Sequence, residues 1–517
     1  MALNSIKYLI FLVLVVGLYY ISPKKYKWVI LLVSSYIFYY LSSSKLVFFL
    51  LLSTLSIYLA GLWIGRQNDK ITDDLTKEEK KIVKTKIKKY KRWILVFTLF
   101  INFGILIFLK YINFLGTGIN FYLDYLGFDF DFPVFKFILP LGISYYTLQA
   151  VSYIVDVYRG KYKPTKNLGK VALFVSFFPQ ITEGPIGRFD QLSEQLYRPN
   201  SFKINNILYG GSLILLGFFK KMVIADRAGI FVNAIFGHRM GGITIIMAGI
   251  LYTLQIYAEF SGCMDIVRGS AKLFGITLAQ NFKRPFFSKS IQEFWQRWHI
   301  TLGAWIKEYI FYPISLSHMA MSVNMACRKH LKGHLGKFIV VAFPLLFVWL
   351  FNGIWHGASL KYVSYGMYYY FIMMFGLLCM PIGKKIIAWL KINTKSWYYR
   401  LFQIIRTNVF VVLGMMLFRS SSLKEFAKMI YHIFSIPYSG IFNHGLGKVD
   451  FVILLICVIL LFIIGLQQEK GKKLYSKFKK LNIGIQIMIY IIIIMSIVIL
   501  GIYGPGYNVS DFIYGQF

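Results

Sequence analysis

Two histidines stand in strongly apolar surroundings and are the residues of this sequence best suited to chemistry. His299 lies in RWHITLGAW, one expected helical turn after Trp295. His356 ends a long apolar run between Trp355 and Gly357. Ionisable groups within apolar segments are costly to bury, so they mark a functional site or a buried partner. A neutral imidazole shielded by an indole can accept a proton near pH 7, which suits a general base acting on a hydroxyl group.

Both histidines also have structural interpretations, and the residues alone leave these open. His356 could be hydrogen-bonded between helices, and His299 could anchor its segment at the level of the lipid headgroups. Asn352 and Arg297 could each polarise a carbonyl or hold an anionic group, or satisfy backbone groups at a helix end. Gly353 allows another backbone or a substrate to approach closely.

The segment around the first histidine has the pattern of a helix at the boundary between lipid and water. Within residues 293–313, Trp295, Trp298, Leu302 and Trp305 recur at helical spacing and form one aromatic and apolar stripe. Indole rings prefer this boundary, so the pattern predicts an interfacial helix. We expect Trp295 and Trp298 to line the substrate site together with Trp355.

A third polar region lies in SFFPQITEGPIGRFDQL, residues 176–192. Its prolines and glycines forbid a straight span, while Gln180, Glu183 and Arg188 are polar at apparent membrane depth. Broken backbone at that depth is tolerated only where protein or a water-filled cavity surrounds it. The region is therefore expected to line a cavity wall, and an extramembrane loop is the alternative.

These residues must be positioned by membrane helices. The chain has 517 residues, of which 57% are hydrophobic and 15% charged. Its apolar runs are continuous rather than alternating, which predicts an all-α polytopic membrane protein with about ten to twelve spans plus re-entrant and interfacial helices. We expect one integral membrane domain with amino-terminal helices in 1–136, a catalytic core in 137–381 and carboxyl-terminal helices in 382–517.

The net charge of +37 is explained by the membrane rather than by nucleic acid. No nucleic-acid motif accompanies it, and the basic residues collect between apolar runs, a bias typical of cytoplasmic loops that contact anionic lipid. Residues 66–92 are expected to form a charged helix along the inner surface, and the topology of 181–325 is left open.

The cysteines are scattered, so neither a disulfide framework nor a metal site is expected. The remaining basic loops lie at 159–170, 328–337, 383–400 and 468–480.

The motifs around both histidines resemble the membrane-bound O-acyltransferase (MBOAT) family. The similarity is to its bacterial polysaccharide branch, which includes the membrane proteins of alginate O-acetylation and teichoic-acid D-alanylation. The closing FIYGQF fits the same branch. The match runs in order through LPLGISYYTLQAVSYIVDVYRG (139–160), SFFPQITEGPIGRFDQL (176–192), EFSGCMDIVRGSAKLFGI (259–276), NFKRPFFSKSIQEFWQRWHITLGAWIKEYIFYP (281–313) and NGIWHGAS (352–359).

The resemblance implies a ring of spans around a central funnel and a tunnel that links the two membrane faces. It implies that His356 is the catalytic histidine and that His299 is a second functional one, nearer the cytoplasmic side. It further implies transfer of an acetyl group from acetyl-coenzyme A, a co-substrate rather than a bound cofactor, to an extracellular or cell-wall polysaccharide. The implied partner is an extracytoplasmic SGNH-type acetyltransferase or a polysaccharide synthase complex, and the implied location is the bacterial cytoplasmic membrane.

Two alternatives are kept. Within the same enzyme class, the chain could transfer D-alanine from a carrier protein to teichoic acid. From another class, it could transport a lipid-linked glycan, with the histidines relaying protons. Repeat-built transporters show internal symmetry, and no repeat is visible here. The polymer is left open, because AEFSGCMD lacks the tyrosine that often follows SG in the alginate type.

Overall fold

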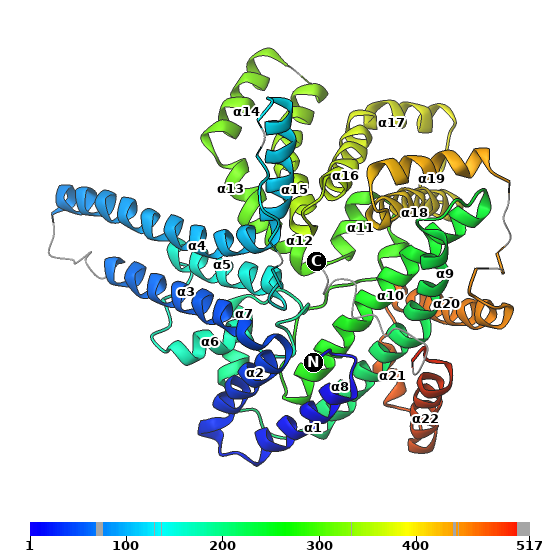
Figure 1. Cartoon of the computed structure of the whole chain (residues 1–517), viewed down its shortest axis with the longest axis horizontal. Helices are drawn as coiled ribbons and strands as arrows, with labels where there is room; N and C mark the ends of the chain where they lie inside the picture. The colour runs from blue at the N-terminus through cyan, green and yellow to red at the C-terminus, as the bar shows by residue number, and fades with distance from the viewer. Residues whose placement is uncertain are drawn as a thin grey trace. The chain divides into compact units, whose positions relative to one another are not determined.

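All regular structure in the described part of the chain is helical, which confirms an all-α protein (Figure 1). Among the described residues, eight helices are long and apolar enough to cross a membrane, or up to nine if the bent pair α16 (Leu360–Leu378) and α17 (Met380–Trp389) forms one span. The protein is therefore a multi-pass membrane protein. The computed structural model describes residues 1–68, 76–128, 130–135, 137–331, 333–437, 441–442 and 444–503, so the closing FIYGQF lies outside the described residues.

These candidate spans of the described residues are fewer than the ten to twelve spans expected from the apolar runs, and the number of crossings stays a prediction. Helices α1 (Ile6–Ile21), α5 (Ile143–Arg159) and α6 (Leu168–Ser176) have only 16, 17 and 9 residues. A straight span needs about 20 residues, so these helices are short for a crossing. Helices α2 (Lys27–Ser43) and α3 (Val47–Asn68) fall within one apolar stretch. The ring, funnel and tunnel stay predictions.

The chain forms two compact units. One comprises Met1–Ile214 with Val267–Ala279, and the other comprises Leu215–Ile266 with Gln280–Phe517. The three-part division at residues 136 and 381 stays a prediction.

In the first unit, the basic segment 66–92 differs from the surface helix that we expected. Helix α4 (Lys77–Tyr125) begins at a capping box between Thr76 and Glu79 and continues for 49 residues without a break. Its basic first part therefore runs directly into an apolar span instead of forming a separate helix. Residues 69–75 of the segment lie outside the described part.

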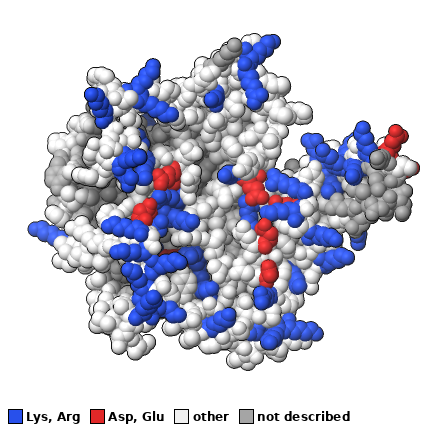
Figure 2. All heavy atoms as spheres, turned by 180° about the vertical axis from the view of Figure 1, so that it is seen from behind, with Lys and Arg blue, Asp and Glu red and all other residues white. Residues whose placement is uncertain are grey.

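In the second unit, charged side chains within apolar segments are paired. On the π-helical turn η3 (Phe219–Ala225), Lys220 Nζ lies 2.6 Å from a carboxylate oxygen of Asp265. Lys221 Nζ lies 3.0 Å from Glu259, and both residues of this pair are buried. Charges within membrane segments persist when they are paired in this way. Figure 2 shows one face, where Lys and Arg are widespread and the few Asp and Glu side chains lie beside them.

The second unit also contains the helices that carry both histidines. A run of short helices is followed by two long, closely packed helices, α15 and α16, and by the carboxyl-terminal spans (Figure 1). The elements are α9 (Asp226–Ile235), α11 (Ile291–Arg297), α12 (Ile300–Ile306), η5 (Lys307–Phe311), α13 (Tyr312–Ser315), α14 (His318–His330), α15 (His334–His356), α18 (Trp397–Arg419), α19 (Leu423–Ser435), α20 (Lys448–Glu469), α21 (Leu474–Phe478) and α22 (Ile483–Leu500). Three others complete the chain: α7 (Phe189–Tyr197) in the first unit, and α8 (Ile204–Phe218) and α10 (Ile243–Leu273), which pass from one unit into the other.

Candidate active site

The expected single helix over 293–313 is wrong, because the chain breaks directly before α12. The backbone of His299 has φ 46° and ψ 51°, a left-handed conformation that residues other than glycine rarely adopt. Such a residue costs about 1–3 kcal/mol and persists only where its surroundings fix it. Trp295 and His299 therefore do not follow one another on a helical turn. The structure instead divides the segment into α11, α12 and the π-helical turn η5.

Asn281 holds this break in place. Its side-chain oxygen accepts hydrogen bonds from the backbone N–H of Thr301 at 2.9 Å and from the Thr301 hydroxyl at 2.7 Å. Its backbone carbonyl accepts a third from the N–H of Ile300 at 3.0 Å. Asn281 is itself buried. These bonds satisfy donors at the start of α12 and fix the backbone on the carboxyl side of His299.

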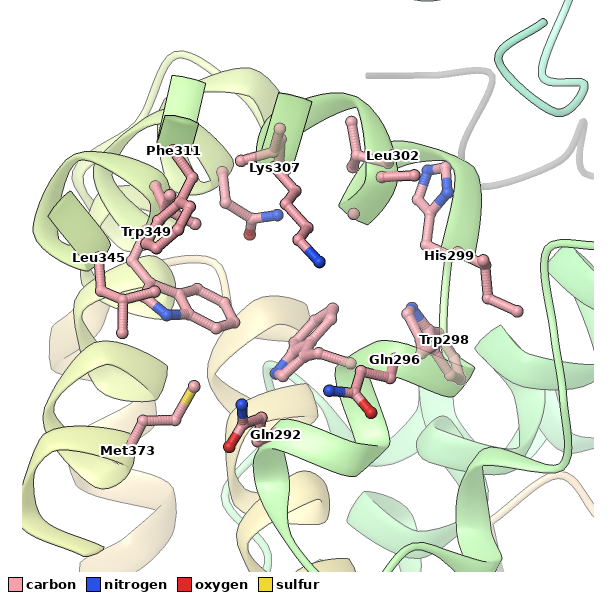
Figure 3. A pocket seen from close by; sticks show the side chains of 17 residues that line it. Gln292, Gln296, Trp298, His299, Leu302, Lys307, Phe311, Leu345, Trp349 and Met373 are labelled. Carbon is pink, nitrogen blue, oxygen red and sulfur yellow. The ribbon is translucent and has the colours of Figure 1, made fainter. Parts of the chain in front are cut away.

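A cavity of about 420 Å³ opens beside the break (Figure 3). It combines apolar and aromatic walls with a few polar side chains, the usual character of a small-molecule site. Of the residues expected at the site, Trp295, Trp298, His299 and Asn352 line it. The other lining residues are Gln292, Gln296, Ile300, Leu302, Gly303, Ala304, Ile306, Lys307, Phe311, Leu345, Val348, Trp349 and Met373.

His299 sits in an aromatic environment at the edge of this cavity. Its side chain is buried, with the imidazole centroid 4.8 Å from Phe260 and 5.9 Å from Trp355. Burial lowers the pKa of His299 from 6.5 to about 3. Because burial disfavours the charged form, the imidazole stays neutral at pH 7. It can then donate one hydrogen bond, but it is a weak proton acceptor.

His356 is the last residue of α15 and is also buried. Its imidazole centroid lies 5.2 Å from Phe418, 5.8 Å from Tyr365 and 5.1 Å from Trp355. Within the described residues, it is not among those that line the cavity, although Asn352, one helical turn earlier, is. The Trp355 indole contacts both imidazoles and so joins the two histidines.

The close packing expected at Gly353 is present. A Cβ atom on this glycine would lie 2.4 Å from the carbonyl oxygen of Tyr362, closer than any side chain tolerates. Gly366 on α16 is equally close to the carbonyl oxygen of Trp349. These glycines let α15 and α16 approach backbone to backbone, and α15 then presents Asn352 to the cavity.

Arg297, also expected at the site, does not line this cavity in the described structure. Its guanidinium binds both carboxylate oxygens of Glu469, at 3.1 and 3.0 Å, and Glu293 at 2.6 Å. Arg284 donates to the same Glu469 carboxylate at 2.6 Å. Arg297 therefore joins α11 to the end of α20. A bidentate pair of this kind fixes geometry strongly.

The remaining expected residues lie in the first unit. Gln180 is buried and donates to the Gln149 side chain at 3.0 Å and to the Pro185 carbonyl at 2.7 Å. Glu183 is buried, and Arg188 immediately precedes α7. The backbone from 177 to 188 is irregular and mostly buried, as the prolines and glycines predicted. All three therefore belong to a packed, non-helical segment of that unit, and their role in lining a cavity stays a prediction.

Three polar residues of the cavity were not predicted: Gln292, Gln296 and Lys307. The two glutamines are four residues apart on α11, so they share one helix face. That spacing is visible in the sequence, but next to the tryptophan stripe it looks like the solvated side of an interfacial helix. Lys307 reaches the cavity that the two glutamines line only because the chain breaks before α12.

The comparisons with known proteins relate the chain to a family of membrane-bound enzymes. The model of the membrane-bound O-acyltransferase family, MBOAT, matches residues 165–327. The probable alginate O-acetylase of Pseudomonas syringae pv. tomato is 30% identical over 426 residues, which cover 82% of this chain and 73% of that protein. The peptidoglycan O-acetyltransferase of Helicobacter pylori is 32% identical over 315 residues, 56% of each chain. The teichoic acid D-alanyltransferase of Bacillus subtilis is 30% identical over 247 residues, which cover 47% of this chain and 60% of that protein.

The helical membrane fold and these relatives together define a multi-pass membrane enzyme of the O-acyltransferase class. The chain belongs to the membrane-bound O-acyltransferase family.

Proposed function

We propose that this enzyme takes an acetyl group from acetyl-coenzyme A on the cytoplasmic side and supplies it for O-acetylation of an extracellular or cell-wall polysaccharide. The observation that carries the proposal is that His299 lies at the edge of a cavity of about 420 Å³ and that the Trp355 indole contacts both His299 and the buried His356. The names of the relatives support the substrate class, because alginate and peptidoglycan O-acetylation are both polysaccharide modifications.

The reaction needs one proton acceptor and one group that stabilises negative charge. His356 removes the proton from the acceptor hydroxyl, and the hydroxyl oxygen attacks the thioester carbon. A new C–O bond forms, the C–S bond breaks, and the leaving thiolate receives the proton that His356 took from the hydroxyl group. His299, neutral because of its low pKa, donates a hydrogen bond to the carbonyl oxygen as that oxygen gains negative charge. Asn352 assists from the cavity wall.

Location and partners follow from the same proposal. The enzyme lies in the bacterial cytoplasmic membrane with its basic loops in the cytoplasm, where acetyl-coenzyme A is made. The acceptor hydroxyl belongs to an extracytoplasmic SGNH-type acetyltransferase or to the polymer at its synthase complex. A base within the membrane lets only the acyl group cross, while the polar donor stays inside.

The experiment compares cells that lack the gene with cells that carry it on a plasmid. Alkali releases ester-linked groups from the purified cell-envelope polysaccharides, and acetate is then quantified. We expect acetate with the wild type and at least a hundredfold less with His356→Ala. His330→Ala on α14, an exposed histidine, is the matched control and should leave acetate unchanged. Both variants are checked for membrane abundance and thermal unfolding in detergent. Normal acetate from a well-folded His356→Ala protein would refute the assignment.

The same measurement separates the alternatives. Transfer of D-alanine, which the teichoic acid D-alanyltransferase relative favours as a second candidate, would release D-alanine instead of acetate. A glycan transporter would release neither, and the lipid-linked glycan would accumulate on the inner leaflet of cells that lack the gene.

A further inference from the structure

Lys307 is the basic residue of the candidate site, and it stands apart from the other basic residues nearby. Figure 3 shows its Nζ pointing into the middle of the cavity. No carboxylate of the described residues lies within ion-pair distance of it, and its Nζ lies 5.7 Å from the centroid of the Tyr312 ring. Arg297 and Arg284 share the Glu469 carboxylate instead. The cavity therefore offers an ammonium group that no carboxylate of the described residues neutralises.

The rest of the lining indicates what kind of ligand would bring the balancing negative charge. Gln292 and Gln296 lie on the near face of α11 with their amides at the cavity (Figure 3). Asn352 adds a third amide from α15. The other walls are apolar, with Trp349 and Met373 among them. A ligand that fits has one anionic group, a small number of amides and much apolar surface.

The phosphopantetheine arm of an acyl thioester has this composition. It carries a phosphate at one end, two secondary amides and a gem-dimethyl group along its length, and the thioester at the other end. A free sugar polymer would present many hydroxyl groups, and three amides and one ammonium are too few to pair them. Buried hydroxyls without partners would weaken the binding of such a polymer.

We propose that Lys307 is the specificity-determining residue for the acyl donor and binds the phosphate of its phosphopantetheine arm. Gln292, Gln296 and Asn352 meet the arm's amides, and the thioester end lies toward His299. The inference rests on the proposed function, because it assumes that a thioester enters this cavity. Lys307 is exposed, so the phosphate keeps part of its hydration while it gains the ammonium.

The first experiment measures equilibrium binding and does not depend on activity. The purified full chain in lipid nanodiscs is titrated with 4′-phosphopantetheine and, separately, with pantetheine, which lacks the phosphate. We expect the wild type to bind the phosphorylated compound about ten to a hundred times more tightly, as a charge-assisted hydrogen bond predicts. Lys307→Gln should remove this preference while it leaves pantetheine binding unchanged. Lys307→Arg should restore part of the preference.

Lys289→Gln is the matched control, because Lys289 is an exposed lysine of the preceding segment that does not line the cavity. It should keep the full preference. Equal binding of both compounds by the wild type, or an unchanged preference in a folded Lys307→Gln protein, would overturn the inference.

Two donors share this arm, and a second measurement distinguishes them. Acetyl-coenzyme A and an acetylated carrier protein with a phosphopantetheine group are each supplied to membranes that contain the enzyme and its acceptor. Lys307→Gln should raise the KM of the donor that is used about ten to a hundredfold with little change in kcat. If acetate transfer occurs with an unaltered KM, the inference fails and the proposed function stands. If neither donor supports transfer while the binding preference holds, the proposed function fails and the phosphate site stands.

Discussion

At the scale of single residues, His299 combines two costly features. Its backbone is left-handed, and its imidazole is buried with a pKa of about 3. Both features work against folding stability, so they are retained only where the surroundings impose them. Strained and buried polar residues concentrate at functional sites, which is why the proposed hydrogen-bond role is placed here.

The low pKa makes a prediction about stability and pH. The unfolded chain binds a proton at this position below pH 6.5, whereas the folded chain does so only below about pH 3. The unfolded state therefore binds more protons between these values, and the free energy of unfolding falls as pH decreases through that window. The slope from this residue is at most about 1.4 kcal/mol per pH unit. His299→Leu should flatten the curve of melting temperature against pH between pH 6.5 and 4.

The control for this experiment is His330→Leu, because His330 is exposed. Its curve should match the wild type. A His299→Leu protein with an unchanged pH dependence would show that the imidazole is protonated as easily in the folded state as in the unfolded one.

Some of the site residues could be recognised in the sequence, and the reason is physical. A histidine among tryptophans in an apolar segment is conspicuous because its burial is costly, and both histidines are indeed buried among aromatic rings. The partner of Arg297 was not predictable, since Glu469 is 172 residues away and nothing local connects them. The place of Lys307 in the cavity was equally unpredictable, because it depends on the break before α12, which no local sequence pattern indicates.

At the scale of elements, the break between α11 and α12 is the feature that shapes the cavity. Residues 298 and 299 are tryptophan and histidine, neither of which usually interrupts a helix, so the even spacing of apolar residues predicted one continuous helix. The interruption comes from Asn281, whose side chain and carbonyl compete for the first N–H groups of α12. Tertiary hydrogen bonds have overridden the local pattern.

Asn281→Ala should therefore affect both stability and catalysis. It leaves the Thr301 N–H and hydroxyl without their buried acceptor, which costs about 1–3 kcal/mol of unfolding free energy. It also frees the backbone next to His299, so acetate transfer should fall at least tenfold at temperatures where the protein remains folded. Thermal unfolding and acetate release measure the two effects.

Asn393→Ala, at an exposed asparagine after α17, should change neither quantity. If Asn281→Ala lowered the melting temperature but kept full transfer, the break would matter for folding only.

At the scale of the whole molecule, the class was predictable, whereas the lengths of the individual helices were not. Continuous apolar runs permit only helices in lipid, so composition sufficed for an all-α membrane protein. Hydropathy does not distinguish a run that crosses the membrane from a buried helix of similar composition. Helix α5 is an example, because nearly all of its residues are buried within the first unit.

The uninterrupted helix α4 allows a direct test of orientation. Its basic beginning is expected in the cytoplasm and its far end outside. A cysteine introduced by Thr85→Cys should react with a membrane-impermeant maleimide only after spheroplasts are permeabilised. Tyr125→Cys, at a side chain that is 81% exposed, should react in intact spheroplasts. The wild-type chain, whose cysteines are mostly buried, provides the background. The opposite labelling pattern would invert the proposed direction of acetyl transfer.

The contact of Trp355 with both imidazoles affects how any pair of substitutions at this site must be interpreted. Residues that share a neighbour rarely contribute independently, and their effects on a rate do not sum. A loss of transfer in a double variant that is smaller than the product of the two single losses would measure the coupling between the histidines. Repeating that cycle in a Trp355→Phe background would show how much of the coupling the indole transmits.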